Sequence, residues 1–357
     1  MSVSRSKLRD PSRQIDDAPR RSRSRSRMIF WRSLVHNWKV IVGVILVGAF
    51  VVIAVFAPLL APYSPSATSF MPLQSPSFHH LLGTTDSGQD VFSQFVWATR
   101  ASLIIGVVAG GLATFFSMLV GMMSGYAGGL IDEVLQLITN VFLIIPALPL
   151  MVVLAAYITL GGSMPIIIVI AATGWAWGAR VLRSQTLSMR SAQYVDAAKI
   201  AGESRLNIVF RTIMPNMIPL IFSGFLFTFI YAILAAAGLE FLGLGNLSGQ
   251  NWGTMLYWAE NGDAMVVGAW WWFVPPGLAI ALVGTGLAFI NYAIDEFSNP
   301  RIRKVRMPTI KKKAGLDVLE KVAYEVSGVS RSNYEPDQKE IVEKISRKEL
   351  PCSGLRD

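Results

Sequence analysis

The chain has 357 residues, of which 52% are hydrophobic and 15% are charged, and its formal net charge is +9. Soluble proteins contain about 25% charged residues, so this composition argues against a soluble globular protein. The single cysteine, Cys352, leaves no intrachain disulfide to expect and offers no metal-site spacing. The low charge content instead predicts a membrane protein.

Lysine and arginine are missing from most of the chain between Val40 and Pro300, and they gather in a few places. The stretches without them hold apolar runs of about 20 residues, which is long enough to cross a bilayer. No charged residue or histidine lies in the middle of any run. We therefore expect an all-α membrane protein with six transmembrane helices, at about 40–61, 102–125, 134–160, 164–183, 217–240 and 268–293.

The same pattern divides the chain into segments. The N-terminal tail is rich in Arg, Ser, Asp and Pro, a composition typical of disorder. In chain order we expect a disordered basic cytoplasmic tail (1–30), an N-terminal segment with the first transmembrane helix (31–62), an extracytoplasmic loop (63–101), a core with five transmembrane helices (102–293) that contains a cytoplasmic loop (184–216), and a cytoplasmic C-terminal tail (294–357).

Charge placement predicts the orientation. The segment up to Lys39 has eleven Lys/Arg against three acids, the loop from Arg180 to Arg211 has six against two, and the tail from Arg301 has fourteen against nine. Loops rich in Lys and Arg remain in the cytoplasm. We therefore expect a multi-pass protein of the cell membrane with both termini and this loop on the cytoplasmic side.

An Arg/Ser run occupies residues 20–27. Basic runs of this kind bind nucleic acid in other proteins, but here no aromatic residue interleaves the run and a membrane span follows closely. We therefore expect membrane lipid as its partner, and no nucleic acid. No short apolar segment with a cleavage site precedes the first span, so we expect no removable signal peptide.

The loop after the first span has five prolines between residues 58 and 76, which excludes a regular helix or a central strand. Farther along, Asp86 or Ser87 is expected to cap a short helix ahead of the second span. A metal site is a second interpretation of this loop, but adjacent histidines do not share a helix face and no further cluster supports them. The residues concerned are His79, His80, Asp86 and Asp90.

Three features mark the spans themselves. Gly121 and Gly125 form a small-xxx-small pair, for which we expect a packing contact between helices of this chain. Pro146 and Pro149 are expected to bend or break the third span. The three tryptophans at 270–272 predict an interfacial belt at the start of the sixth span, with a sugar-stacking platform as the alternative.

The charged segment between the fourth and fifth spans predicts two short helices. The first carries small residues that allow another protein's surface to approach its backbone, and Gly202 tolerates the left-handed conformation of a helix end. Ser204 is expected to cap the second helix, which we expect to end near Met214 and Pro215. This helix pair is a docking surface and not a catalytic site.

The same segment resembles the EAA loop of binding-protein-dependent ABC importer permease subunits, through Asp196-Ala-Ala, Gly202 and Ile213-Met-Pro215. Asp196 stands where many members have Glu, and Thr212 where the general pattern is aliphatic. The likeness to the oligopeptide and dipeptide branch runs from about residue 31 to 303. Further sequence phrases that carry the resemblance begin at Leu82, Gly238, Pro276 and Asp295. Glu240 departs from the family pattern, and we expect its side chain to be solvated at the membrane interface.

The resemblance implies the type I ABC importer permease architecture with a cytoplasmic coupling helix. It implies as partners a second homologous permease subunit (a heterodimer), two ATP-binding subunits and an extracytoplasmic solute-binding protein. The sequence has no G-x-x-x-x-G-K-[ST] phosphate loop, so we expect no catalytic residues, cofactor or metal in this chain. The expected ATPase-coupling residues are Tyr194, Asp196, Ala197, Ala198, Ala201, Gly202 and Pro215.

Two other classes fit the sequence less well. An ion-coupled secondary transporter buries ionisable residues near the membrane midplane, and an intramembrane protease needs a buried nucleophile with a base, or metal ligands. The three histidines all lie outside the expected spans. The expected function is ATP-driven import of oligopeptides or dipeptides, with oligosaccharides or nickel chelates as alternative substrates.

Overall fold

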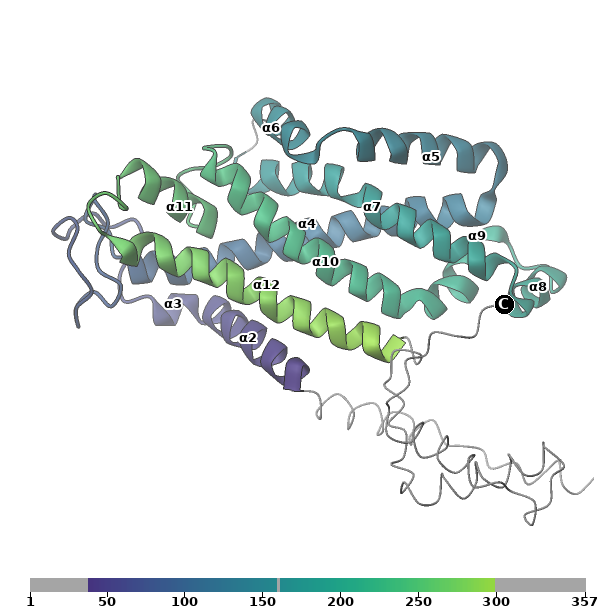
Figure 1. Ribbon diagram of the computed structural model, residues 1–357, viewed down its shortest axis with the longest axis horizontal. Helices are drawn as coiled ribbons and strands as arrows, with labels where there is room; N and C mark the ends of the chain where they lie inside the picture. Colours follow the sequence, from purple (N-terminus) through teal and green to yellow (C-terminus); the bar gives the residue numbers. More distant parts are fainter. Residues whose placement is uncertain (1–37, 159–160, 299–357) are drawn as a thin grey trace, which may run out of the picture. The chain divides into compact units, whose positions relative to one another are not determined.

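The computed structural model describes residues 38–158 and 161–298, which belong to one unit of the chain, Met1–Pro300. The basic N-terminal tail, the C-terminal tail and Cys352 lie outside the described residues. The described part is helical, apart from an isolated bridge between Thr84 and Asp90. Its helices (Figure 1) are α2 (Trp38–Val55), α3 (Ala57–Leu60), α4 (Val91–Ala127), α5 (Gly129–Ile144), α6 (Ala147–Tyr157), α7 (Met164–Arg190), α8 (Gln193–Ile200), α9 (Arg205–Asn207), the π-helix η2 (Ile208–Ile213), α10 (Met214–Phe241), α11 (Trp252–Asn261) and α12 (Trp270–Ser298).

In the described ranges, five helical stretches are long and apolar enough to cross a membrane. They are α2, α4, α7, α12 and the run that joins α9, η2 and α10. The bent pair α5 and α6 makes a sixth if it counts as one span. These stretches overlap all six predicted spans, so the predicted all-α membrane fold is confirmed.

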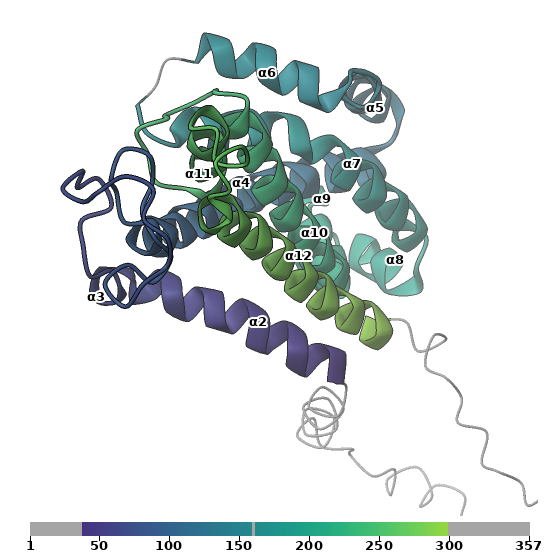
Figure 2. The same cartoon turned by 60° about the vertical axis from the view of Figure 1, so that its left-hand side comes forward.

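The third predicted span is broken, as its prolines suggested. Ile145 is extended, with φ −69° and ψ 127°, and Pro146 precedes the first residue of α6. A residue before proline is pushed out of the helical region, because the proline ring collides with its backbone. The axes of α5 and α6 consequently differ by 93°, and Figure 2 shows α6 turned away from α5. Pro149 lies in the first turn of α6, where proline is tolerated.

The central contact of the bundle joins α4 to α7. A Cβ atom on Gly121 would lie 2.4 Å from the Ala179 carbonyl oxygen, and one on Gly125 would lie 2.7 Å from the Arg183 carbonyl oxygen. Only glycine allows backbones to approach this closely, which is the usual role of small residues where membrane helices cross. The predicted packing contact within the chain is therefore confirmed.

The remaining spans join this pair through further close contacts. Gly110 of α4 faces the backbone of Phe229 in α10, and Gly43 of α2 faces the Gly286 carbonyl oxygen in α12. Consistent with these contacts, α10 lies between α7 and α12, and α2 lies beside α12 (Figure 1).

Helix α5 joins the bundle through polar side chains and through Phe142, which packs on Trp175 of α7. The Arg183 guanidinium donates two hydrogen bonds of 2.7 Å to the Asp132 carboxylate, and Ser124 at the end of α4 donates a third. Arg180 donates to the Asn140 side chain at 2.8 Å. The opposite face of α5 is apolar and exposed, as Leu130 and Ile144 show at 78% and 80%. Polar contacts thus fix this helix against α7 while it leaves apolar side chains for lipid or protein.

We predict that Gly121→Ala lowers the thermal unfolding midpoint of the detergent-solubilised protein, because the new methyl group overlaps the Ala179 carbonyl. Overpacking of this kind costs about 1–3 kcal/mol. Gly48→Ala is the matched control, since a Cβ at Gly48 of α2 meets nothing within 4 Å. An equal midpoint for both variants would contradict the close α4–α7 crossing.

Candidate coupling surface and outer loop network

Helix α8 ends in a Schellman motif. Gly202 has φ +79°, the Glu203 N–H donates to the Ala198 carbonyl at 3.1 Å, and the Gly202 N–H donates to the Lys199 carbonyl at 3.0 Å. This pair of bonds requires a left-handed residue after the helix, which glycine adopts without a Cβ clash. The Ser204 hydroxyl then accepts from the Asn207 N–H at 3.3 Å and caps α9. The predicted helix end at Gly202 and the predicted cap at Ser204 are both present.

Helix α8 is fixed to the spans by a buried apolar cluster. Val195 has no exposed surface and packs in one cluster with Met122 of α4, Leu182 of α7 and Met217 of α10. Ala198 is half-buried against the same cluster. The small side chains of α8 therefore divide between two faces, and only Ala197 and Ala201 point away from the protein together with Tyr194.

The charged residues of α8 pair with each other. Lys199 Nζ lies 2.8 Å from an Asp196 carboxylate oxygen, and both side chains are exposed. Exposed ion pairs contribute about 0–1 kcal/mol. The Asp196 carboxylate is therefore readily available to another hydrogen-bond donor at this surface.

The second helix does not end at Met214 and Pro215 as predicted. Instead, α9 continues through η2 into α10, and Pro215 lies in the first turn of α10. Within η2 the chain winds more widely, so the Met214 N–H donates to the Val209 carbonyl five residues earlier. Inside an α-helix the proline ring collides with the carbonyl four residues earlier. The wider π-helical turn and the position of Pro215 in the first turn of α10 both avoid this collision. The segment after Gly202 is thus continuous with a membrane span.

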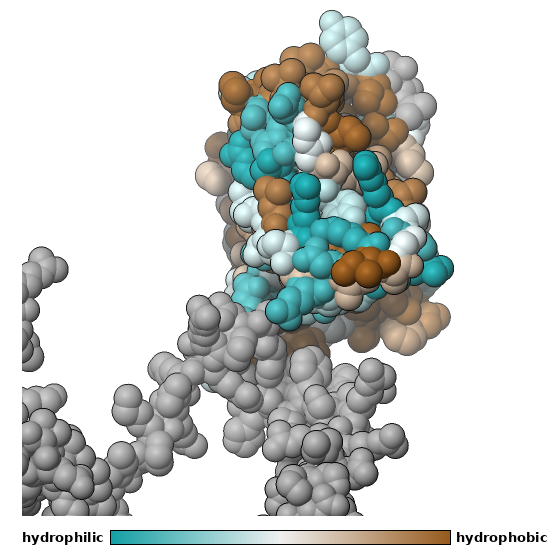
Figure 3. All heavy atoms as spheres, turned by 90° about the vertical axis from the view of Figure 1, so that its right-hand side faces the viewer, coloured by the Kyte–Doolittle hydropathy of each residue, from teal (hydrophilic) through white to brown (hydrophobic). Residues whose placement is uncertain are grey.

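Two apolar side chains at this end of the protein were missed in the sequence. Ile200 is 88% exposed and Leu206 is 60% exposed, on either side of the Gly202 turn. Figure 3 looks onto this end and shows hydrophilic side chains with apolar ones among them. A signal was available, because isoleucine and leucine are unusual choices in a short, highly charged loop unless they contact something.

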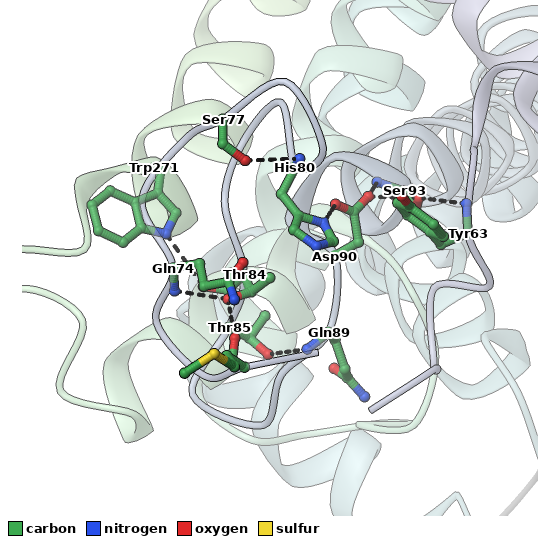
Figure 4. A network of polar contacts seen from close by, with 11 residues as sticks. Tyr63, Gln74, Ser77, His80, Thr84, Thr85, Gln89, Asp90, Ser93 and Trp271 are labelled. Carbon is green, nitrogen blue, oxygen red and sulfur yellow. Dashed lines mark hydrogen bonds and ion pairs between the residues drawn. The ribbon is translucent and has the colours of Figure 1, made fainter. Parts of the chain in front are cut away.

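At the opposite end of the helices, a network of polar contacts orders the proline-rich loop (Figure 4). His80 Nδ1 lies 2.8 Å from one Asp90 carboxylate oxygen, and the other oxygen accepts from both the N–H and the hydroxyl of Ser93. The rings of His80, Tyr63 and Phe70 pack against one another, with each ring in contact with the other two. Asp90, and not Asp86 or Ser87, caps the helix, and α4 consequently begins well before the predicted start at 102.

This network disfavours the alternative metal site. Within the described ranges, no group of three or more His, Cys, Asp or Glu side chains is placed to hold a metal ion. His80 and Asp90 are buried, whereas Asp86 is exposed and contacts Ser87. The two histidines therefore do not act together.

The tryptophan run does not form one belt. Trp270 is 54% exposed, Trp272 is 2% exposed, and the indole N–H of Trp271 donates to the Thr84 carbonyl at 3.3 Å. The predicted belt of three tryptophans is wrong, because successive helical residues point about 100° apart and Trp272 consequently turns into the core of the bundle. The same geometry leaves no common platform for a sugar ring.

The prediction of a solvated Glu240 is also wrong. The side chain is 2% exposed, and its carboxylate accepts from the Asn251 side-chain N–H at 2.8 Å. Asn251 caps the start of α11, and Gly253 lets that helix approach, since a Cβ there would lie 2.6 Å from Glu240 Oε2. Glu240 thus holds α11 against the end of α10.

The fold and these two ends define a multi-pass α-helical membrane protein with a short helix pair at one end and an ordered loop at the other. Residues 117–304 match the family described as binding-protein-dependent transport system inner membrane component, and residues 27–76 match the N-terminal transmembrane domain of oligopeptide transport permease C. The chain belongs to this family of binding-protein-dependent inner membrane components, as the EAA-like loop indicated.

Curated relatives cover most of the chain. The dipeptide transport system permease protein DppC of Alkalihalophilus pseudofirmus is 34% identical over 276 residues, which are 76% of this chain and 89% of the relative. The oligopeptide transport system permease protein OppC of Bacillus subtilis is 32% identical over 271 residues, 75% of this chain and 87% of the relative. The probable D,D-dipeptide transport system permease protein DdpC of Escherichia coli is 31% identical over 264 residues, which are 73% of this chain and 87% of the relative.

We predict that Asp90→Ala lowers the thermal unfolding midpoint and opens the loop at 61–90 to protease. The change removes a helix cap and leaves buried His80 unpaired, a combined loss of about 2–4 kcal/mol. Asp86→Ala removes an exposed carboxylate from the same loop and should change stability by less than about 0.5 kcal/mol. Equal protease sensitivity in the two variants would show that the His80–Asp90 contact does not order the loop.

Proposed function

We propose that this chain is one of two permease subunits of an ATP-driven importer that carries peptides. The observation that carries the proposal is the α8–Gly202–α9 pair, which is seated on three spans and presents an outer face of small and apolar side chains. The peptide substrate is supported by the relatives, whose names concern dipeptide and oligopeptide transport. Oligosaccharides and nickel chelates are the competing substrates.

The proposed assembly contains four kinds of subunit. A second, homologous permease lies beside this chain so that the pathway forms between them, two ATP-binding subunits lie on the cytoplasmic side, and a solute-binding protein delivers the peptide on the other side. The sequence itself has no phosphate-binding loop, which supports ATP binding by separate subunits. The charge distribution supports cytoplasmic termini and a cytoplasmic α8.

In the proposed mechanism α8 sits in a groove of one ATP-binding subunit. Closure of the ATP-binding pair pushes α8, and the push reaches the spans by two routes. One route is the buried cluster around Val195, which includes side chains of α4, α7 and α10. The other is the continuous helix from α9 through η2 into α10. Both routes support alternating access by movement of these spans together.

Each residue of the pair has a proposed role. Tyr194, Ala197 and Ala201 contact the ATP-binding subunit, and Asp196 exchanges its bond to Lys199 for one with that partner. Ala198 supports α8 from within, Gly202 sets the angle to α9, and Pro215 starts the span that receives the movement. Placement of these side chains on the outer and inner faces supports this division.

The substrate is tested with the solute-binding protein that copurifies with the complex. Short peptides, β-linked oligosaccharides and nickel are compared for their effect on its thermal unfolding. A ligand at about 100 times its dissociation constant adds about 2.7 kcal/mol of stability. A shift with peptides alone supports the proposal, whereas a shift with sugars or nickel alone overturns the substrate but not the importer.

We predict that Gly202→Val abolishes peptide uptake by the reconstituted complex while leaving membrane insertion intact. A β-branched residue at φ +79° strains the turn by about 1–2 kcal/mol and changes the angle between α8 and α9. Gly268→Val is the matched control, because Gly268 has φ +76° and also has nothing within 4 Å of its Cβ position. Uptake that falls equally in both variants would mean that the turn has no special part in coupling.

We also predict that Ile200→Ser weakens copurification of the ATP-binding subunits and lowers peptide-stimulated ATP hydrolysis. An apolar anchor that fills a partner's groove contributes about 2 kcal/mol or more. Val266→Ser serves as the control, since Val266 is 84% exposed in a loop at the other end of the bundle. Normal ATPase retention in the Ile200 variant would remove this residue from the proposed interface.

A further inference from the structure

A cavity of about 260 Å³ lies between α4, α7, α10 and α12. Pockets for whole small molecules usually measure about 300–1,000 Å³, so this one has room for a single side chain and not for a whole peptide. Most of its lining is apolar, contributed by α7 and α10. Polar groups nevertheless converge on it from α10 and α12.

The polar end of the cavity holds a hydroxyl, an amide and a carboxylate, from Ser223, Asn291 and Asp295. The Ser223 hydroxyl lies 2.5 Å from the Asn291 side-chain oxygen and 3.0 Å from an Asp295 carboxylate oxygen. A hydroxyl carries one proton, so it cannot satisfy both oxygens. Within residues 38–158 and 161–298, Asp295 forms no ion pair with a basic side chain.

The mouth of the cavity is aromatic. The rings of Trp177 and Phe227 lie 5.1 Å apart and are tilted by 31°. Both side chains line the cavity and are about half exposed, at 53% and 49%. The aliphatic stem of a lysine or arginine packs on apolar and aromatic surface while its charged end reaches a polar group. Aromatic walls and a carboxylate at one end favour a cation with an aliphatic stem.

We propose that this cavity binds one cationic side chain, a lysine or arginine, of the peptide in transit. Asp295 and Asn291 accept hydrogen bonds from its charged end, and Trp177 and Phe227 enclose its stem. The inference rests on the proposed peptide-import function and adds to it a preference for basic peptides. An apolar side chain fits less well, because it offers no charged donor to the Asp295 carboxylate.

The test uses the complete importer, reconstituted in vesicles of phosphatidylcholine and phosphatidylglycerol. Initial uptake is measured for two tripeptides, Ala-Lys-Ala and its norleucine counterpart, which keeps the stem and lacks the ammonium group. Asp295→Asn should lower the lysine-to-norleucine uptake ratio by about threefold to tenfold, the range expected when a charge-assisted hydrogen bond becomes a neutral one in a partly exposed site.

Two further variants make the test specific. Phe227→Leu should lower the same ratio, since it removes one aromatic wall and leaves the carboxylate in place. Asp263→Asn removes an exposed carboxylate by the same chemical change in a distant loop and should leave the ratio unchanged. Uptake of the norleucine peptide reports whether each variant is folded and assembled.

The outcomes separate this proposal from the function on which it depends. If the unmodified importer carries neither peptide, the peptide-import function fails. If it carries both and Asp295→Asn lowers both uptakes by one factor, or changes neither, the cation site is overturned while the import function stands. In vesicles that also contain phosphatidylethanolamine, a fall of the unmodified ratio to the Asp295→Asn value would assign the cavity to a lipid headgroup and overturn the proposal.

Discussion

The close crossing of α4 and α7 at Gly121 and Gly125 is the contact on which the rest of the bundle depends. In a membrane, apolar side chains gain little by leaving lipid for protein, so helix pairs are held by close packing and by hydrogen bonds. The two glycines bring the backbones together, and this brings Met122 and Leu182 into the cluster that seats α8. The crossing also places Arg183 beside Asp132, which attaches α5. One backbone contact thus positions both α8 and the peripheral α5.

Features governed by local chemistry could be predicted from the sequence. The positions of the spans followed from the distribution of charge, the break at Pro146 from the geometry of proline, and the helix end at Gly202 from the conformational freedom of glycine. Each depends on a residue and its near neighbours along the chain, and the structure bears each of them out.

Features that depend on distant segments could not be predicted in this way. Glu240 is buried because Asn251 returns to meet it, and Asp90 is the helix cap because His80 holds its carboxylate. Neither contact has a sequence signature. Proline chemistry alone also misplaced a helix end at Pro215, since it took no account of the π-helical turn before it. The cavity at Asp295 exists only where four helices meet.

The π-helix η2 has a consequence for the direction of α8. Its wider turn accommodates one more residue than an α-helical turn would, so the extra residue is absorbed within Ile208–Ile213. In a regular α-helix each residue rotates the chain by about 100°, so an extra residue there would turn α8 by about that angle and take Val195 out of its buried cluster. A deletion of one residue within η2 would instead restore regular winding and leave α8 close to its present direction. The helix pair can therefore keep its place on the spans when the loop changes in length by one residue at this point.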